Sequence, residues 1–184
     1  MYQKVIDFWF KSIEPSSWWE KNLEFDRQIA KEFGSLHSQV VACELYEWRS
    51  EPYGRLAEII ILDQFSRNIF RDTPQAFAYD SLALALAQEA IRSGVESRLS
   101  AIERSFVYLP YMHSESRSIH EVALELYEKN GIENNMKFEK QHKAIIDRFG
   151  RYPHRNEILG RVSTEEEIEF LKQPNSSFYK ISNQ

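Results

Sequence analysis

Residues that break regular structure are scarce in this chain, and this scarcity limits the folds open to it. The 184 residues include only six glycines and six prolines, whereas average usage of about 7% and 5% would give roughly 22 of them. A sandwich of many short strands is therefore excluded, and a few long elements are favoured. Apolar residues make up 42% and charged residues 28%, a balance typical of a globular protein and not of a disordered chain.

Apolar residues recur every three or four positions over long stretches, which is the spacing of one face of an α-helix. One such stripe runs from Leu23 to Val40, where only Leu23 and Phe25 are spaced more closely than three positions. Another runs from Leu56 to Ile69. The pair Thr73-Pro74 is typical of a helix start. Threonine caps the first backbone amides, and proline lacks the amide donor that the first turn of a helix leaves unpaired. We therefore expect a helix over 75–93, ended by Gly94 in a left-handed conformation.

Further helices are expected in the second half of the chain. Ser100 opens one that Pro110 kinks or stops, since proline removes a backbone hydrogen bond and clashes with the preceding turn. Two more span 115–129 and 133–149, and a glycine marks the end of each. Ser163, with a glutamate three residues later, matches a capping box at the start of a short last helix.

Together these elements predict an all-α fold, a single-domain bundle of seven to nine helices. The domain spans 1–172, its last helix ends at Leu171, and 173–184 form a polar C-terminal tail. No linker, internal repeat or period-two strand pattern divides the chain.

Charge and targeting signals point to the cytoplasm. The net charge of −5 and the pI near 5.6 describe a surface that repels nucleic acid and anionic membranes by default. The longest aliphatic run is Ile59–Leu62, far short of the ~20 residues of a membrane span, and the first residues do not form a signal peptide. The lone Cys43 forms no internal disulfide and is interpreted as a small core residue. No nucleic-acid or membrane partner is expected, and the sequence sets no oligomeric state.

Polar residues gather first in the segment 63–71. Asp63, Arg67 and Arg71 are spaced by four, which places them on one helix face. One interpretation is a solvated acid–base ladder. The other is that the two guanidinium groups converge on an anion, because their planar forks suit carboxylate or phosphate oxygens.

A second polar group surrounds the proline-broken helix. Glu103 and Arg104 precede the apolar run that contains Tyr108, and His113 and Glu115 follow it. A histidine in this position donates to a carboxylate, titrates near neutrality, or caps the carbonyl groups that a broken helix leaves free.

The third group lies in the segment 148–161, where four arginines and a histidine fall close together in an acidic protein. They are Arg148, Arg151, His154, Arg155 and Arg161, with Asn156 among them. Such a cluster needs a bound anion, the carbonyl groups at a helix C-terminus, or internal carboxylates such as Asp63, Glu103 or Glu115. These explanations remain open.

Other chemistry lacks its sequence pattern. Glu139 and His142 form one Glu-x-x-His pair, whereas a di-iron bundle needs two such pairs and two further glutamates. His113 and His120 add no recognised metal-ligand spacing. Phosphate loops, dinucleotide fingerprints and nucleophile elbows are also missing. We therefore expect no metal and no cofactor.

Three long motifs resemble a known bacterial family. They run over 62–77 (LDQFSRNIFRDTPQAF), over 103–115 and over 148–164, and the opening DFWF at 7–10 adds to them. This pattern resembles the family called domain of unknown function 924, along almost the whole chain. The resemblance implies an all-helical fold related to tetratricopeptide-repeat (TPR) proteins, and it implies no activity. The segment 116–120 departs from the family, which commonly has an acid and later a glutamine there.

These observations give three hypotheses of function. The first is a binding module in which the polar segments form one pocket for an anionic small molecule or a peptide carboxylate. The second is a structural or protein-interaction module, in which the arginines and carboxylates form an internal network. The third is a hydrolase in which a histidine acts as general base beside a glutamate.

The hypotheses name specific residues. The candidate ligand-binding residues are Arg67, Asn68, Arg71, Arg104, Tyr108, His113, Arg151, His154, Arg155 and Asn156, and Tyr111 and Tyr152 could line the apolar wall. The candidate catalytic residues are His113, His154, Glu103 and Glu115.

Overall fold

Helices numbered α1 to α9 make up most of the described chain in the computed structural model, which describes residues 1–174, 176 and 180–181. Most of the predicted polar tail therefore lies outside the described residues. The bounds are α1 (Tyr2–Asp7), α2 (Leu23–Val41), α3 (Pro52–Ile60), α4 (Ser66–Ile69), α5 (Asp80–Arg92), α6 (Ala101–Met112), α7 (Arg117–Asn130), α8 (Glu133–Phe149) and α9 (Glu165–Leu171).

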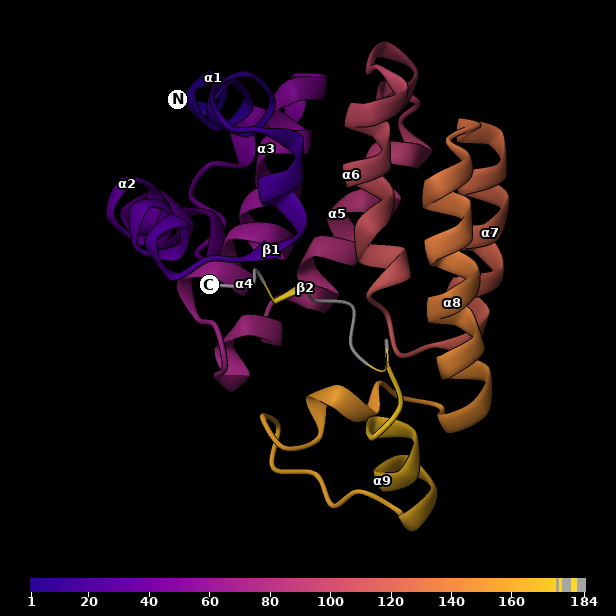
Figure 1. The fold of residues 1–184 in the computed structure, drawn as a ribbon. Coiled ribbons are helices and arrows are strands. Elements are labelled where there is room, and N and C mark those ends of the chain that lie inside the picture. The colour runs from indigo at the N-terminus through magenta and orange to yellow at the C-terminus, as the bar shows by residue number, and fades with distance from the viewer. Residues whose placement is uncertain (175, 177–179, 182–184) are drawn as a thin grey trace.

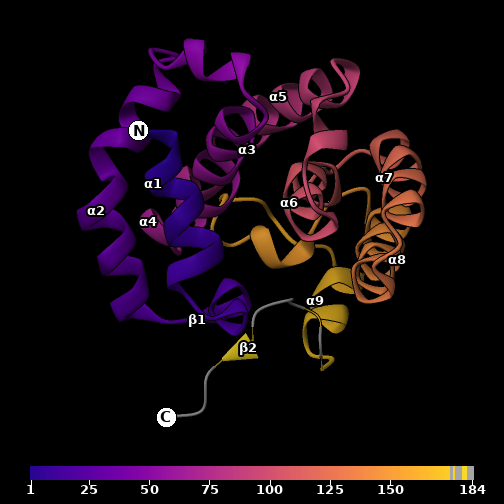
Figure 2. The same cartoon turned by 90° about the horizontal axis from the view of Figure 1, so that it is seen from above.

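The helices follow one another across the molecule and the chain then turns back. Figure 1 shows α1 to α4 on one side, α5 and α6 in the centre, and the α7–α8 pair on the other side. Beyond α8 the chain crosses beneath the central helices, which Figure 2 shows from a perpendicular direction. This return brings the short 3₁₀ segment η7 (Pro153–Arg155) against helices from the middle of the sequence.

The core is rich in aromatic side chains near the N-terminus. Trp9 packs edge-on against Phe65 and Phe106, with ring centroids 5.5 and 5.9 Å apart, and Phe33 lies 4.8 Å from Phe65. All four side chains are buried, so the π-helical segment after α1 (Phe8–Ser12), α2, α6 and the segment before α4 share one apolar cluster. Within the described residues, no helix combines the length and the apolar character that crossing a bilayer requires.

The all-α prediction is confirmed, and several helix ends match the predicted ones. The helix α8 has the predicted bounds, and Gly94 and Gly150 adopt the left-handed conformation, with φ of 72° and 69°. Ser100 caps α6 in a capping box with Glu103. The helix continues past Pro110 and ends two residues later, at Met112.

Three predicted helix starts are wrong. The helix expected over 115–129 begins only at Arg117 and ends at Asn130. The expected helix over 75–93 begins only at Asp80, because the segment η5 (Pro74–Phe77) forms a separate 3₁₀ turn. The Thr73 hydroxyl donates to the Phe70 carbonyl oxygen and so does not cap a helix. The last capping box is formed by Thr164 and Glu167, one residue after the predicted pair.

The helix expected over Leu56–Ile69 contains a π-helical segment, η4 (Ile61–Phe65), between α3 and α4. All five of its residues are buried. A π turn holds one residue more than an α turn, and such turns are frequent at functional sites. Asp63 lies at its centre.

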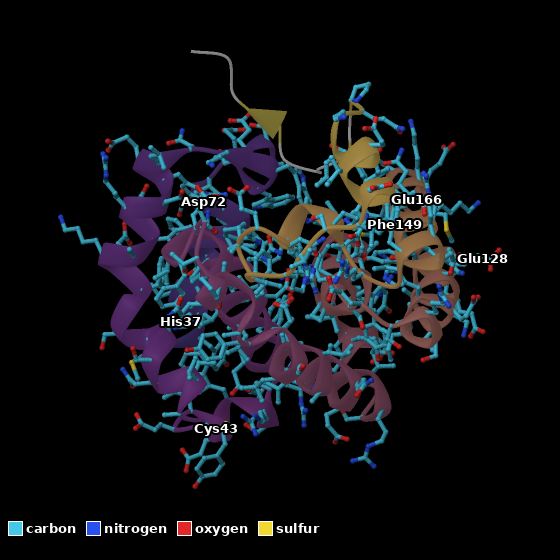
Figure 3. The ribbon with its side chains drawn as sticks, turned by 90° about the horizontal axis from the view of Figure 1, so that it is seen from below. His37, Cys43, Asp72, Glu128, Phe149 and Glu166 are labelled. Carbon is cyan, nitrogen blue, oxygen red and sulfur yellow. The ribbon has the colours of Figure 1, made fainter. Side chains whose placement is uncertain are left out.

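Two features were not predicted. A short parallel pair joins β1 (Glu20–Lys21) to β2 (Lys180–Ile181), with Glu20 opposite Lys180. Cys43 is exposed in the turn after α2 (Figure 3), and its φ is 57°. The interpretation of Cys43 as a core residue is therefore wrong, because α2 ends at Val41 and Cys43 does not extend its apolar face. The relation to TPR proteins stays a prediction.

Replacing Gly54 with alanine is expected to destabilise the fold, because a Cβ there would overlap the backbone carbonyl oxygen of Trp48. Overpacking of this kind costs roughly 1–3 kcal/mol. In the matched control, Gly34→Ala in α2, no atom lies within 4 Å of the added Cβ, and alanine should stabilise the helix by about 0.5–1 kcal/mol. Urea denaturation measures both variants, and equal free energies of unfolding would contradict the packing described for α3.

Candidate functional site

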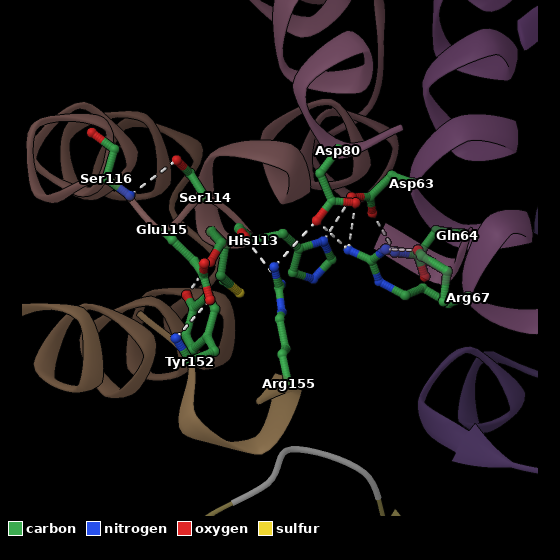
Figure 4. A network of polar contacts seen from close by, with 12 residues as sticks. Asp63, Gln64, Arg67, Asp80, His113, Ser114, Glu115, Ser116, Tyr152 and Arg155 are labelled. Atoms are coloured by element: carbon green, nitrogen blue, oxygen red, sulfur yellow. Dashed lines mark hydrogen bonds and ion pairs between the residues drawn. The ribbon is translucent and has the colours of Figure 1, made fainter. Parts of the chain in front are cut away.

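Two nearly buried arginines from distant parts of the chain share one carboxylate. Arg67 Nη2 lies 2.8 Å and Arg155 Nη1 lies 3.3 Å from Oδ2 of Asp80. The arginine side chains are 9% and 8% exposed, and that of Asp80 is 20% exposed. Figure 4 shows the two guanidinium groups reaching Asp80 from α4 and from the segment after α8. We call Arg67, Asp80, His113 and Arg155 the central site.

Backbone and aromatic groups hold the two guanidinium groups. Arg67 also donates to the carbonyl oxygen of Ala76, which the 3₁₀ turn leaves outside any α-helix. Arg155 Nη2 donates to the carbonyl oxygen of His113, at 3.0 Å. Both guanidinium carbons lie over the Phe77 ring, 4.6 and 4.7 Å from its centroid, a favourable cation–π geometry.

Arg155 is in an unfavourable electrostatic position. Burial and then the charge of Arg67 lower its pKa, while Asp80 acts in the opposite direction. Its Nε is buried and has no hydrogen-bond partner among the described residues. A buried donor left in this way costs about 1–3 kcal/mol, so the arrangement calls for a further acceptor.

His113, the residue directly after α6, pairs with Asp63. Its Nδ1 lies 2.7 Å from Asp63 Oδ1, and Gln64 Nε2 donates to Oδ2 at 2.6 Å. The Asp63 side chain is 1% exposed and that of His113 is 18% exposed. Burial opposes ionisation of Asp63, but His113 and Arg67 together hold its pKa below the ordinary value. His113 therefore faces a carboxylate, as the sequence suggested, but the acid is Asp63 and not a glutamate.

His154 lies near the central site without adding charge to it. Burial and then the charge of Arg155 lower its pKa to about 3, so the ring is neutral at pH 7. Its ring centroid is 5.4 Å from that of Tyr152. Tyr152 in turn lies beneath Arg155, whose guanidinium carbon is 4.6 Å from the ring centroid.

The other residues of the first motif bond elsewhere. Arg71 binds both carboxylate oxygens of Asp26, and Asn68 donates to the same carboxylate at 2.8 Å. These contacts join α4 to α2. Arg67 and Arg71, although four residues apart, therefore have different carboxylates, and the predicted convergence of these two arginines does not occur.

Arg151 and Asn156 belong to a second network, around Glu167. Arg151 makes two hydrogen bonds to Glu167, of 2.6 and 2.7 Å, and Asn156 adds one of 3.3 Å. Arg161 binds both oxygens of Glu115, which also accepts from the backbone amide of Tyr152 at 2.8 Å. The Glu115 bonds join the segment after α8 to the residues that follow α6, and the Glu167 bonds join it to α9, so the role of both sets is structural.

The residues at the start of α6 also have partners of their own. Arg104 donates to Asn130 at 3.0 Å and to the carbonyl oxygen of Leu99 at 2.9 Å, and Glu103 closes the capping box of α6. Tyr108 is buried and packs edge-on against Tyr127. Arg104 and His113 are nine positions apart, which corresponds to about 13 Å of helix, so Arg104 does not join the central site.

Glu139 pairs with His120 and not with His142. His120 Nδ1 lies 2.6 Å from Glu139 Oε1, and its Nε2 lies 2.9 Å from the carbonyl oxygen of Ser114. Burial raises the pKa of Glu139, which favours its neutral form. His142 Nδ1 bonds to the carbonyl oxygen of Phe138. Over the part of the chain that is described, no three His, Cys, Asp or Glu residues are placed to hold a metal ion.

A pocket of about 390 Å³ lies elsewhere, beside β1 and the start of α2. Its lining residues are Ser17, Glu20, Asn22, Glu24, Phe25 and Gln28. None of these is a predicted site residue. We place no function there, because its two acids and its helix start do not by themselves form a site.

Comparison with known proteins identifies the family. The chain matches the family described as bacterial protein of unknown function, DUF924, over residues 5–175. The chain belongs to this family. Among solved structures, a protein of unknown function from Agrobacterium tumefaciens superposes with a TM-score of 0.89 at 36% identity, over 94% of this chain and 97% of that chain. No curated protein matched.

The three motifs that resemble DUF924 proteins meet at the central site. Asp63 and Arg67 come from the first motif, His113 comes from the second and Arg155 comes from the third. Asp80 lies outside all three, and sequence reasoning missed it. The sequence offers little indication of this role, because Asp80 lies inside the helix expected over 75–93 and its spacing from the arginines matches no helical pattern.

Glu167 should contribute stability that depends on pH. Its bonds to Arg151 hold its pKa at about 2, below the usual 4.5, so the contribution is present above pH 4.5 and is lost as the pH falls toward the lower value. Glu167→Gln is therefore expected to lose stability at pH 7, and its difference from the unchanged protein should shrink in acid. Urea denaturation across this range measures the difference.

The control is Glu166→Gln, because Glu166 is 61% exposed and pairs with Arg148 on the surface. It should change the free energy of unfolding by under about 1 kcal/mol. A Glu167→Gln deficit that stays constant from pH 7 into acid would contradict the assigned role of its carboxylate.

Proposed function

We propose that the protein binds a small anionic molecule, bearing a carboxylate or a phosphate, at the central site. The observation that carries this proposal is the sharing of Asp80 by Arg67 and Arg155. Arg71 and Arg151 each bind both oxygens of a carboxylate, from Asp26 and Glu167 respectively. The central arginines instead share the Oδ2 atom of Asp80, and Arg67 Nη2 also lies 2.8 Å from Oδ1, so neither of them has a carboxylate of its own.

The geometry of the donors supports this proposal. Each terminal guanidinium nitrogen carries two hydrogens, and Arg155 uses one bond from Nη1 and one from Nη2. Its buried Nε has no partner among the described residues. Donors of this kind form short, charge-assisted bonds to carboxylate and phosphate oxygens. His113 and Asp80 are the partly exposed members of the central site, so a ligand would approach past their side chains.

The candidate ligand contacts are therefore reduced to Arg67, His113 and Arg155, with His154 beside them. Asn68, Arg71, Arg104, Arg151 and Asn156 bond within the fold. For these residues the contacts favour the structural hypothesis. The hydrolase hypothesis in its original form has less support, because Glu103 and Glu115 bind groups other than histidine.

Removing Asp80 tests the proposal. Asp80→Ala leaves two nearly buried guanidinium groups without their shared carboxylate, a change expected to cost roughly 3–5 kcal/mol. Acetate or phosphate should restore part of the lost stability, because either anion supplies the missing oxygens. Thermal unfolding in acetate, phosphate and chloride, at constant ionic strength, measures this rescue.

The unchanged protein provides the second measurement. Phosphate, or a peptide with a free carboxylate, should raise its melting temperature above that in chloride. Arg155→Gln should abolish this rise, whereas Arg148→Gln, an arginine paired at the surface with Glu166, should retain it. The proposal fails when no anion stabilises the unchanged protein and none rescues Asp80→Ala.

A further inference from the structure

The Asp63–His113 pair has the orientation of a general base. The Nδ1 atom of His113 is engaged in the hydrogen bond to Asp63. Since Asp63 is ionised, Nδ1 carries the proton in this pair, and in the neutral ring the lone pair is therefore on Nε2. Nε2 has no hydrogen-bond partner among the described residues. The ring is 18% exposed while Asp63 is buried, so the solvent-facing part of the pair belongs to the histidine.

Three supports fix the position of this pair. Asp63 lies in the π-helical segment η4, and Gln64 holds its second oxygen. Arg155 binds the carbonyl oxygen of His113, so the same arginine that would hold an anion also holds the backbone of the base. In the view of Figure 4 the imidazole of His113 lies between the guanidinium groups of Arg67 and Arg155.

The charged and titratable groups around His113 come from several elements. Asp63 faces it from η4, Arg67 from α4 and Arg155 from η7. His142 of α8 lies 6.4 Å away between ring centroids, and burial keeps the pKa of His142 well below its ordinary value. His154 is also near and neutral. Asp63 is therefore the carboxylate that bonds to the imidazole.

We infer that His113 is the general base, and Asp63 its positioning residue, in the hydrolysis of a carboxylic ester that carries an anionic group. This inference rests on the proposed function, because Arg67 and Arg155 would hold the anionic group. Such a substrate would place its ester beside His113 Nε2, which is the geometry that general-base catalysis needs.

The reaction needs only water as co-reactant. His113 Nε2 takes a proton from water while the water oxygen forms a bond to the acyl carbon. The tetrahedral adduct then breaks its bond to the alcohol oxygen, and the proton on Nε2 passes to that oxygen. The products are the carboxylic acid and the alcohol, and the histidine returns to its neutral form. No oxidation or reduction occurs.

The test uses two chromogenic esters of 4-nitrophenol. The succinate monoester carries a free carboxylate, whereas the acetate ester is neutral. We expect the unchanged protein to hydrolyse the succinate monoester at least tenfold faster than His113→Gln does, with a smaller ratio for the acetate ester. Arg155→Gln should raise KM for the succinate monoester, and the surface variant Arg148→Gln should change neither constant.

Asp63→Asn separates positioning from simple support of the fold. An asparagine amide that donates to Nδ1 moves the ring proton to Nε2, which removes the base while keeping the shape of the side chain. We expect kcat to fall at least tenfold at pH 7, with a changed pH profile. A purely structural role would leave the profile unchanged.

A chemical probe provides a readout that does not depend on turnover or on the folding of a variant. Diethylpyrocarbonate should modify His113 of the unchanged protein faster than His37, His120 and His142, which are buried. Phosphate should slow the modification. Mass spectrometry of the peptides measures both rates.

The outcomes distinguish the two proposals. Equal hydrolysis by the unchanged protein and His113→Gln on both esters would overturn the catalytic inference, as would slow modification of His113. The anion-binding proposal would then still stand if phosphate raises the melting temperature. A melting temperature that no anion changes would instead overturn the binding proposal, together with the inference that depends on it.

Discussion

The carboxylate of Asp80 joins parts of the chain that lie far apart in sequence. Two guanidinium groups, both nearly buried, meet at one of its oxygens. Like charges repel strongly where water is largely excluded, so this meeting depends on the negative charge between them. Because Arg67 extends from α4 and Arg155 from the returning segment, Asp80 at the start of α5 fixes where that segment lies across the bundle. Glu115 and Glu167 hold the same segment at further points.

Two classes of arginine can be distinguished in this fold. Arg71, Arg151 and Arg161 each bind two oxygens of one carboxylate, in a closed arrangement that secures one element against another. Arg67 and Arg155 share the carboxylate of Asp80, and both guanidinium groups lie over the Phe77 ring. Buried charge pairs add little net stability, which explains why the closed pairs serve geometry. The shared pair is better suited to a ligand, and His113 lies at the point where such a ligand would be held.

Local signals predicted the helices well, and contacts between distant segments much less well. The bounds of α8 follow from apolar spacing and a terminal glycine, both of which are local. The last capping box was misplaced because Ser163 and Thr164 both precede a glutamate by three residues, and the pattern does not choose between them. Asp80 was missed because its partners lie 13 and 75 positions away. Predicting the pairing of His113 with Asp63 would have required the packing of α6 against the segment η4, which no local pattern gives.

The π turn before α4 makes the central site depend on chain length as well as on residue type. One residue rotates an α-helix by about 100°, so the extra residue within Ile61–Phe65 sets the direction in which every later side chain of that helix points. Deleting one residue from the turn would restore ordinary α-helical hydrogen bonding. The same deletion would rotate Arg67 away from Asp80, and would do so without altering a single charged group. Within this family, an insertion or deletion in this turn would therefore mark a protein whose central site is built differently.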